Sequence, residues 1–495
     1  MTNGRTDSSS GDGAPREVDA AAPPVAPAQR PGRKFDRSIV EGPVLRAVWK
    51  IAWPTMLQNV IGGLQGMIDH AMVGNYVGFT GNAAIGVSWQ IFLVVIVFVS
   101  SLYSGMGVLV ARFAGAGDSD KVNRTVYQAF LTSIVLAIGV LAPIGYVLSP
   151  ALLDVVNAAP DVKAEALPYL RIMFLFSFGM LVFFMLGGAL RAAGDARTPL
   201  RIGIVVTVLN IILNVILIRG LGPIPAFGTA GAAMGTVIAT GSVSIIAFIL
   251  LRRGTWVVSF PRGMSYRPDL QVIRSLFRFG LPTGFQGVAM NVAGVMLLRF
   301  IGSLEHSAEA QAAFAVGYTE LFSLITWTSV GLMGATAAVV GQNLGAKQPE
   351  RAISAVHGAA RIGLGVAAAV GFLFLVIPQQ LLGVFGMNDP VATGIGVLLL
   401  RFLSVSGFFI TVALTYTGGL QGTGDTRSPM WISIISQIII PLGLCFVLQQ
   451  TRGLEAGDIW LAILLGHFTR AGLSVLRFRQ GKWRHIIVDI GPARA

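Results

Sequence analysis

The chain has 495 residues, of which 54% are hydrophobic and only 12% are charged, and its mean hydropathy is +0.72. Soluble proteins of this length do not combine so little charge with so much apolar sequence, so the composition predicts an integral membrane protein. The net charge of +13 suits contact with anionic lipid headgroups, and we do not expect the chain to bind nucleic acid.

Residues 1–40 are rich in Pro, Ala, Ser and Gly, which predicts a disordered cytoplasmic tail. Twelve apolar stretches follow, each long enough to cross a bilayer, for which about 20 residues are needed. They cover 46–72, 82–111, 124–148, 166–190, 199–220, 228–251, 276–302, 311–341, 353–378, 394–421, 429–449 and 455–477. The predicted all-α membrane fold therefore has an N-terminal six-helix lobe (41–251), a cytoplasmic inter-lobe linker (252–275), a C-terminal six-helix lobe (276–480) and a cytoplasmic tail (481–495).

A motif between two apolar stretches occurs twice, about 230 residues apart. Residues 194–199 (GDARTP) return as 424–429 (GDTRSP), and Gln58 corresponds in order to Gln286. Six spans in each half predict two lobes with the same orientation, related by a pseudo-twofold axis along the membrane normal. Duplicated membrane domains are mostly transporters that bind substrate between the halves. We therefore expect an inward-facing cleft between the lobes.

Basic residues concentrate in the even-numbered loops and at both ends of the membrane region. Arg252 and Arg253 begin the linker, and Arg477 and Arg479 end the last span, whereas the odd-numbered loops are mostly acidic. The positive-inside rule then places both termini in the cytoplasm, in a multi-pass protein of the plasma membrane.

Asp69 lies inside an apolar segment, where a carboxylate is costly and is retained mainly if it binds something. Its functional interpretation is a proton or Na⁺ site in the first lobe. The alternative is an interfacial aspartate that caps a helix end beside His70. The corresponding position in the second half is Leu297, so the duplication does not require an acid in both lobes.

Glu320 is the other acidic residue well inside apolar sequence, and its counterpart is Gln90. It is a candidate partner for a substrate cation or a second proton site, and Gln65 and Gln286 are grouped with it. An equally weighted alternative is a glutamate whose carboxylate is satisfied by neighbouring side chains, among them Tyr318, Thr319 or an arginine.

Asn210 and Asn214 are one helical turn apart, so their amides share a face of the fifth span. Thr236 follows on the sixth span. These groups could complete the coordination of a small cation or hold a water near Asp69, or they could form ordinary interhelical hydrogen bonds.

Enzyme motifs are absent: there is no ATP phosphate-binding motif and no HExxH or CxxC. We expect no enzyme activity, no cofactor and no certain metal site, with Na⁺ at Asp69 left open.

Together these segments resemble the multidrug and toxic compound extrusion (MATE) family, in its prokaryotic DinF-like branch. The resemblance covers about 40–480 and rests on 67–74 (MIDHAMVG), 190–199 (LRAAGDARTP), 209–214 (LNIILN) and 340–346 (VGQNLGA). It implies two six-helix lobes and export of organic cations, drugs or amphiphilic metabolites in exchange for H⁺ or Na⁺. The partners expected are a small cationic or amphiphilic molecule and the lipid bilayer, with the chain as a monomer.

The resemblance also implies a first-lobe cation site at Asp69, Asn210, Asn214 and Thr236. Many relatives carry Asp where this chain has Asn214, which leaves the coupling ion open between H⁺ and Na⁺. The alternative function within transport is a flippase or exporter of a lipid or lipid-linked metabolite. Such proteins usually line their cavity with cationic side chains that bind phosphate groups. Arg299 and Arg401 are the candidates for that role. A non-transporting membrane scaffold or receptor is the alternative from another class.

Overall fold

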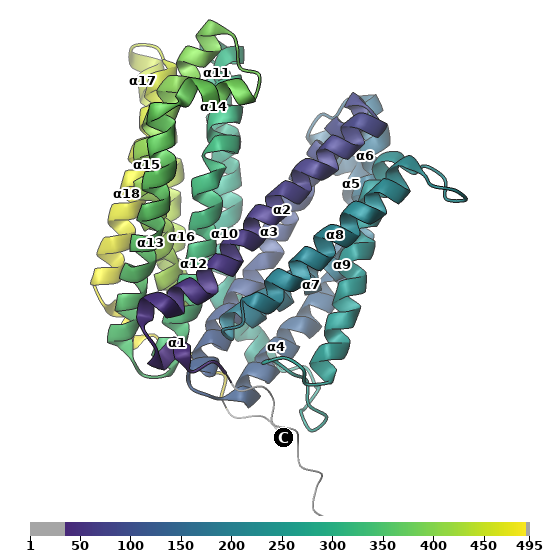
Figure 1. Ribbon diagram of the computed structural model, residues 1–495, viewed down its shortest axis with the longest axis vertical. Helices are drawn as coiled ribbons and strands as arrows, with labels where there is room; N and C mark the ends of the chain where they lie inside the picture. Colours follow the sequence, from purple (N-terminus) through teal and green to yellow (C-terminus); the bar gives the residue numbers. More distant parts are fainter. Residues whose placement is uncertain (1–34, 492–495) are drawn as a thin grey trace, which may run out of the picture.

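The computed structural model describes residues 35–491 as two helical lobes that meet at one end (Figure 1). The first lobe contains α2 (Val44–Tyr76), α3 (Phe79–Gly115), α4 (Ser119–Ile134), η1 (Val135–Leu141), α5 (Ala142–Val155), α6 (Pro160–Leu175), α7 (Ser177–Ala192), α8 (Arg197–Arg219) and α9 (Gly228–Arg252). The second contains α10 (Leu270–Ile301), α11 (Ser307–Phe314), η2 (Ala315–Leu321), α12 (Ser323–Gly345), α13 (Pro349–Val376), α14 (Pro378–Val384), α15 (Pro390–Thr423), α16 (Arg427–Ile434), η3 (Ile435–Ile439), α17 (Ile440–Thr451) and α18 (Ala456–Arg479). Two short helices, α1 (Ser38–Glu41) and η4 (Lys482–His485), flank them.

The predicted twelve spans in two lobes are confirmed. Within the described chain, ten helical segments are individually long and apolar enough to cross a membrane, and the bent pair α6–α7 supplies an eleventh. The remaining span, α2, is 33 residues long and carries Gln58, Gln65 and Asp69, which lower its hydropathy. The one span that is not apolar enough to be recognised by its hydropathy is thus the span that carries the candidate ion-coupling acid.

The repeated motif forms the same local structure in both lobes. Gly194 and Gly424 adopt positive φ angles of 97° and 94°, which glycine accepts without steric cost. The following aspartates lie two residues before α8 and α16 and contact their first turns. Asp195 accepts hydrogen bonds from the amide and hydroxyl of Thr198, and Asp425 accepts the same pair from Ser428. Both copies of the motif keep the same residue types because both form this turn, with glycine at the positive φ angle and aspartate as the hydrogen-bond acceptor.

The predicted fourth span is not continuous. Its two parts, α6 and α7, are bent by 55° at Phe176. Close packing accompanies the bend, because a Cβ atom on Gly179 of α7 would lie 2.6 Å from the backbone of Gly241 on α9. Only glycines permit that approach. The bend places Tyr169 and Met180, on either side of it, along one cavity.

Three segments predicted to be tails or linkers are partly built into the fold. The predicted disordered tail 1–40 falls mostly outside the described residues, but its described end begins α1, where Ile39 is fully buried. The linker packs Val258 and Phe260 into the core of the first lobe. Ile490, beyond the last span, is buried in the same core. The chain between and after the lobes therefore covers the first lobe at one end.

The lobes approach each other most closely at the end that carries α1 and η4, here named the closed end, and they diverge toward the opposite end (Figure 1). A Cβ atom on Gly105 of α3 would lie 2.0 Å from the carbonyl oxygen of Leu276 on α10. One on Gly115 would lie 1.9 Å from the carbonyl oxygen of Gln342 on α12. The expected inward-facing cleft is therefore wrong for this conformation, because backbone packing seals the end that the positive-inside rule assigns to the cytoplasm.

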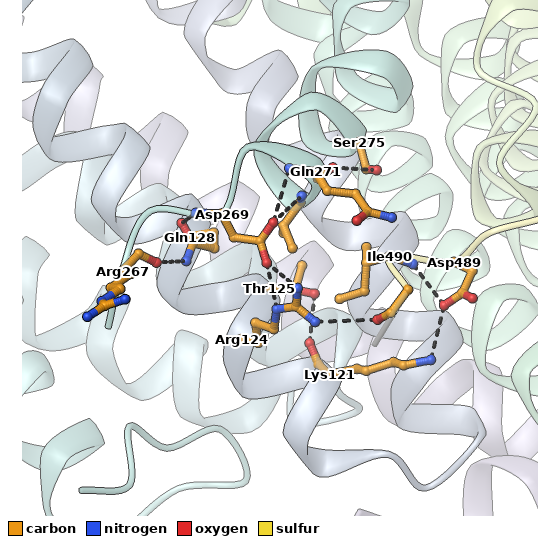
Figure 2. A network of polar contacts seen from close by, with 12 residues as sticks. Lys121, Arg124, Thr125, Gln128, Arg267, Asp269, Gln271, Ser275, Asp489 and Ile490 are labelled. Carbon is orange, nitrogen blue, oxygen red and sulfur yellow. Dashed lines mark hydrogen bonds and ion pairs between the residues drawn. The ribbon is translucent and has the colours of Figure 1, made fainter. Parts of the chain in front are cut away.

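Polar contacts reinforce the closed end (Figure 2). Arg124 of α4 donates from Nε to Asp269 at 2.9 Å and pairs with the same carboxylate through its terminal nitrogen. Since Asp269 caps the start of α10, this pair links the two lobes directly. Lys121 donates to Asp489 at 3.0 Å, and Arg124 also donates to the carbonyl oxygen of Gly491. The segment after α18 is thereby fastened to the first lobe.

Replacing Gly105 by Ala should weaken the closed end, because its methyl group would collide with the backbone of α10. Overpacking of this kind costs about 1–3 kcal/mol, so the purified variant should unfold at a lower temperature than wild type. Gly107→Ala on the same helix is the matched control, because a Cβ atom there meets nothing within 4 Å and gains the same helix propensity. Equal unfolding temperatures for the two variants would contradict the proposed role of this contact.

Candidate functional site

A cavity of about 320 Å³ lies in the first lobe, walled by α2, α3 and α6 to α9. One residue of the second lobe reaches it: Trp327 of α12 lines the cavity, and its carbonyl oxygen accepts a hydrogen bond from Asn59 at 3.3 Å. The cavity is thus enclosed almost entirely by one lobe, beside its contact with the other.

Asp69 lies on the wall of this cavity and is held by uncharged groups. Asn214 Nδ2 donates to Asp69 Oδ1 at 2.7 Å. In the amide orientation that satisfies both of its polar atoms, Asn210 also donates to Asp69 Oδ1, at 3.1 Å, and its oxygen accepts from Thr236 Oγ1 at 3.2 Å. The structure therefore brings together the four residues that the sequence singled out for the ion-coupling site.

The amide of Asn214 fits this site because α9 presents no side chain opposite it. A Cβ atom on Gly235 would lie 2.1 Å from Asn214 Oδ1. Asn214 itself is fully buried, and its Oδ1 has no hydrogen-bond partner among the described residues. The oxygen is therefore a buried acceptor without a donor, packed against Gly235, while the amide nitrogen contacts Asp69.

The alternative in which Asp69 caps a helix end does not fit the structure. Helix α2 continues past Asp69 to Tyr76. His70 also lines the cavity, but its Nδ1 pairs with Asn82 Oδ1 of α3 at 2.5 Å. Asp69 is consequently not part of a pair with His70.

The rest of the cavity wall is mostly apolar and aromatic. Gln65 lies near Asp69 and accepts a hydrogen bond from Thr207 at 2.8 Å. The aromatic lining consists of Trp89, Tyr169, Phe183, Phe184 and Trp327. Such a surface binds apolar groups, and ring faces attract organic cations. The arrangement offers one carboxylate within an aromatic enclosure.

The structure does not bring the second-lobe candidates into this site. Gln286 is buried and donates to Ser433 Oγ of α16 at 2.7 Å. Glu320 is exposed in η2, and among the described residues its carboxylate forms no ion pair or side-chain hydrogen bond. Neighbouring side chains therefore do not satisfy Glu320, and it stays a candidate outside the cavity.

Sequence reasoning missed an arginine that supports the cavity wall. Arg191 of α7 donates from Nη1 to Gln58 Oε1 at 3.1 Å, across the lobe. Its position at the end of an apolar stretch had marked it only as a topology signal. Arg299 and Arg401, the candidates for binding lipid phosphates, are exposed and do not line the cavity.

A metal centre is not indicated in the described part of the chain, where no three His, Cys, Asp or Glu residues cluster. The site contains one carboxylate and amide groups. As they stand, the amides direct N–H groups toward Asp69, which suits a carboxylate that exchanges a single proton. Na⁺ ligation would need amide oxygens to turn toward the ion.

Comparisons with known proteins agree with this geometry. The MatE family model matches residues 54–216 and 282–447, one block in each lobe. A probable multidrug resistance protein NorM from Thermotoga maritima is 28% identical over 88% of this chain and 92% of its own length. The multidrug resistance protein MdtK of Pectobacterium atrosepticum is 24% identical over 88% and 95%.

A solved structure described as the outward-facing conformation of a multidrug resistance MATE family transporter superposes with a TM-score of 0.82 at 22% identity. The superposition covers 92% of this chain and 100% of the solved chain, so the two proteins share a fold. Because the family model matches well over half of the residues, in two blocks that coincide with the two lobes, the chain belongs to the MatE family and is a multi-pass membrane transporter rather than an enzyme.

Proposed function

We propose that this transporter is a proton-coupled antiporter that exports a monovalent organic cation or a cationic amphiphile. The observation that carries the proposal is the surroundings of Asp69. It is the one carboxylate that lines the described cavity, it is held by two neutral amides, and aromatic rings enclose the remaining space. A single negative charge there can be balanced by a substrate cation or by a proton.

Competition for this charge explains the exchange of substrate for protons. When Asp69 is ionised, the cavity attracts a cation and its aromatic wall binds the apolar part. When Asp69 is protonated, the charge is removed and the hydrogen bonds from Asn210 and Asn214 must rearrange, so a bound cation is released. The coupling is a difference in affinity between two protonation states, as linkage requires.

The supporting argument for protons rather than Na⁺ is the composition of the site. Hard cations prefer several oxygen ligands, with more negative charge than one carboxylate supplies. Here Asn214 contributes an amide where a second carboxylate would strengthen Na⁺ binding. We therefore assign the proton as the main coupling ion, with no cofactor.

With the closed end in the cytoplasm, the conformation described here faces outward. The protein then lies in the plasma membrane with both termini cytoplasmic, and we propose that it acts as a monomer, because each chain contains both lobes. In this orientation protons reach Asp69 from outside, where protonation would favour release of substrate.

The two carboxylate ties at the closed end do not break in the working pH range. Partial burial alone would raise the pKa of Asp269, but its hydrogen bonds with Arg124 and two backbone amides outweigh this and hold the pKa below its usual value. The hydrogen bond from Lys121 likewise lowers the pKa of Asp489. Groups with a lowered pKa contribute their stability above the ordinary value and lose it as the pH falls through the lowered one. Near neutral pH both ties remain intact, so these two ion pairs do not provide the proton coupling.

No specific observation favours the lipid flippase. Arg299 and Arg401 lie outside the cavity, and the cavity contains an acid rather than a phosphate-binding cation. A scaffold or receptor gives no reason to enclose Asp69 in an aromatic cavity.

Asp69→Asn should abolish efflux driven by a pH gradient while the protein still folds, because the amide keeps the shape and removes the titrating charge. In proteoliposomes loaded with a fluorescent monovalent cation, we expect coupled efflux to fall by about tenfold or more. Asp154→Asn, the same substitution at an exposed carboxylate of α5, is the control and should transport like wild type. Coupled transport at the wild-type rate by Asp69→Asn would refute the proposed mechanism.

Asn214→Asp should change the ion dependence. The new carboxylate would lie within hydrogen-bonding distance of Asp69, and two such groups resist ionising together. A bound Na⁺ would relieve their repulsion, so the variant should gain Na⁺-driven efflux or shift its pH optimum upward. Wild type and variant are compared under separate pH and Na⁺ gradients. Identical profiles would show that residue 214 does not take part in ion coupling.

Reporter fusions test the orientation. A fusion after Arg253 and one after Arg479 should both report the cytoplasm, whereas one at Asp389, beside the start of α15 at the opposite end, should report the outside. The expectation follows from the basic residues at the closed end. An external signal from the fusion after Arg253 would overturn both the topology and the outward-facing assignment.

A further inference from the structure

The second lobe contains a buried arginine with no acidic partner. Arg470 lies midway along α18, with 2% of its surface exposed. Its Nε and Nη1 atoms have no hydrogen-bond partner among the described residues, and none of the described ion pairs includes it. The guanidinium is thus enclosed in the lobe without an acceptor for two of its nitrogens.

The groups around Arg470 supply further donors rather than a counter-charge. His467, one turn earlier on α18, is equally buried, and its Nδ1 also has no partner within the described chain. The imidazole stacks on Phe322, with ring centroids 5.9 Å apart. Tyr318 and His467 are the ionisable groups within electrostatic range of Arg470, and neither is an anion at neutral pH. The interior therefore presents N–H donors and positive charge.

An uncompensated charge in this position is expensive. Enclosing an arginine in the interior of a membrane protein costs several kcal/mol unless an opposite charge and hydrogen bonds compensate it. The one acid on α18, Asp458, pairs with Arg452 instead, and Glu320 in η2 is exposed and forms no ion pair in the described structure. The chain itself does not provide the compensation.

We propose that the second lobe binds a small monovalent anion, of the chloride type, against Arg470. The guanidinium supplies charge and two N–H donors, and His467 supplies a third donor in the tautomer that carries its proton on Nδ1. This site is the reverse in sign of the first-lobe site. Helix α9, the last of its lobe, contributes Thr236 to an acidic site, whereas α18, the last of the second lobe, contributes a base.

The anion site is separate from the Asp69 cavity, none of whose lining residues lies on α18. A test that refutes the proposed antiport would therefore leave the anion site unaffected, and the reverse also holds. The same chemistry would also accept a carboxylate, so the experiment must distinguish a free halide from an organic acid.

Thermal unfolding of the purified, detergent-solubilised protein tests the proposal. Sodium chloride or bromide should raise the unfolding temperature saturably relative to sodium gluconate at the same ionic strength, by about 3 °C or more at saturation. Sodium acetate is the third arm: a rise with acetate and none with halide would overturn the halide assignment and favour a carboxylate. No difference among the four salts would refute an anion site.

Two substitutions assign the effect to Arg470. Arg470→Gln should abolish the halide-dependent rise, and Arg470→Lys should retain it at higher halide concentrations, because a point charge replaces the planar donor. Arg401→Gln, which removes an exposed arginine of the same lobe, is the control and should respond like wild type. A full halide response in Arg470→Gln would place the bound anion elsewhere and contradict the proposal.

Bromide diffraction gives a test that needs no variant. Crystals of the wild-type protein grown in bromide should show an anomalous peak within hydrogen-bonding distance of the Arg470 guanidinium. This measurement decides the matter even if Arg470→Gln fails to fold. A well-ordered site without an anomalous peak would refute the proposal.

Discussion

The proposed transport mechanism depends on one carboxylate that the fold holds with amides instead of a positive charge. Asp69 faces Asn210 and Asn214 rather than a lysine or arginine, so its charge stays available to a mobile partner. A fixed cation would have satisfied the acid permanently and removed it from exchange. Enclosure by aromatic rings limits that partner to a proton or a cation with an apolar body. The remaining architecture positions this group and controls which side of the membrane it faces.

The lobes share a frame but differ in the chemistry they place within it. The two GDxRxP turns precede α8 and α16 with the same aspartate hydrogen bonds, and glycines let the lobes pack backbone to backbone at the closed end. Within this common frame the first lobe holds the partly buried Asp69 and the second buries Arg470. Duplication thus supplies two similar bodies, and later substitution gives each body its own charged group.

Hydropathy and the repeat were sufficient to predict the spans and lobes, because burial in lipid imposes both length and composition. Helical spacing placed Asn210 and Asn214 on one face, and the cost of a carboxylate in apolar sequence singled out Asp69. The family resemblance then grouped these three residues with Thr236 in one site. The bend at Phe176 was not predictable, because an apolar window is the same whether a helix is straight or broken. The conformation was also missed, since the contacts of Gly105 and Gly115 join distant segments. Arg470 was overlooked because buried acids were sought and buried bases were not.

The central claim is that a substrate cation and a proton compete for Asp69, and proton release on binding tests it most directly. Calorimetric titration of the purified transporter with a monovalent organic cation, repeated in buffers of different ionisation enthalpy, measures the protons released. The account predicts that the release approaches about one proton per bound cation at a pH where Asp69 is protonated in the free protein, and falls to zero in Asp69→Asn. Tight binding by wild type with no proton release at any pH would contradict it.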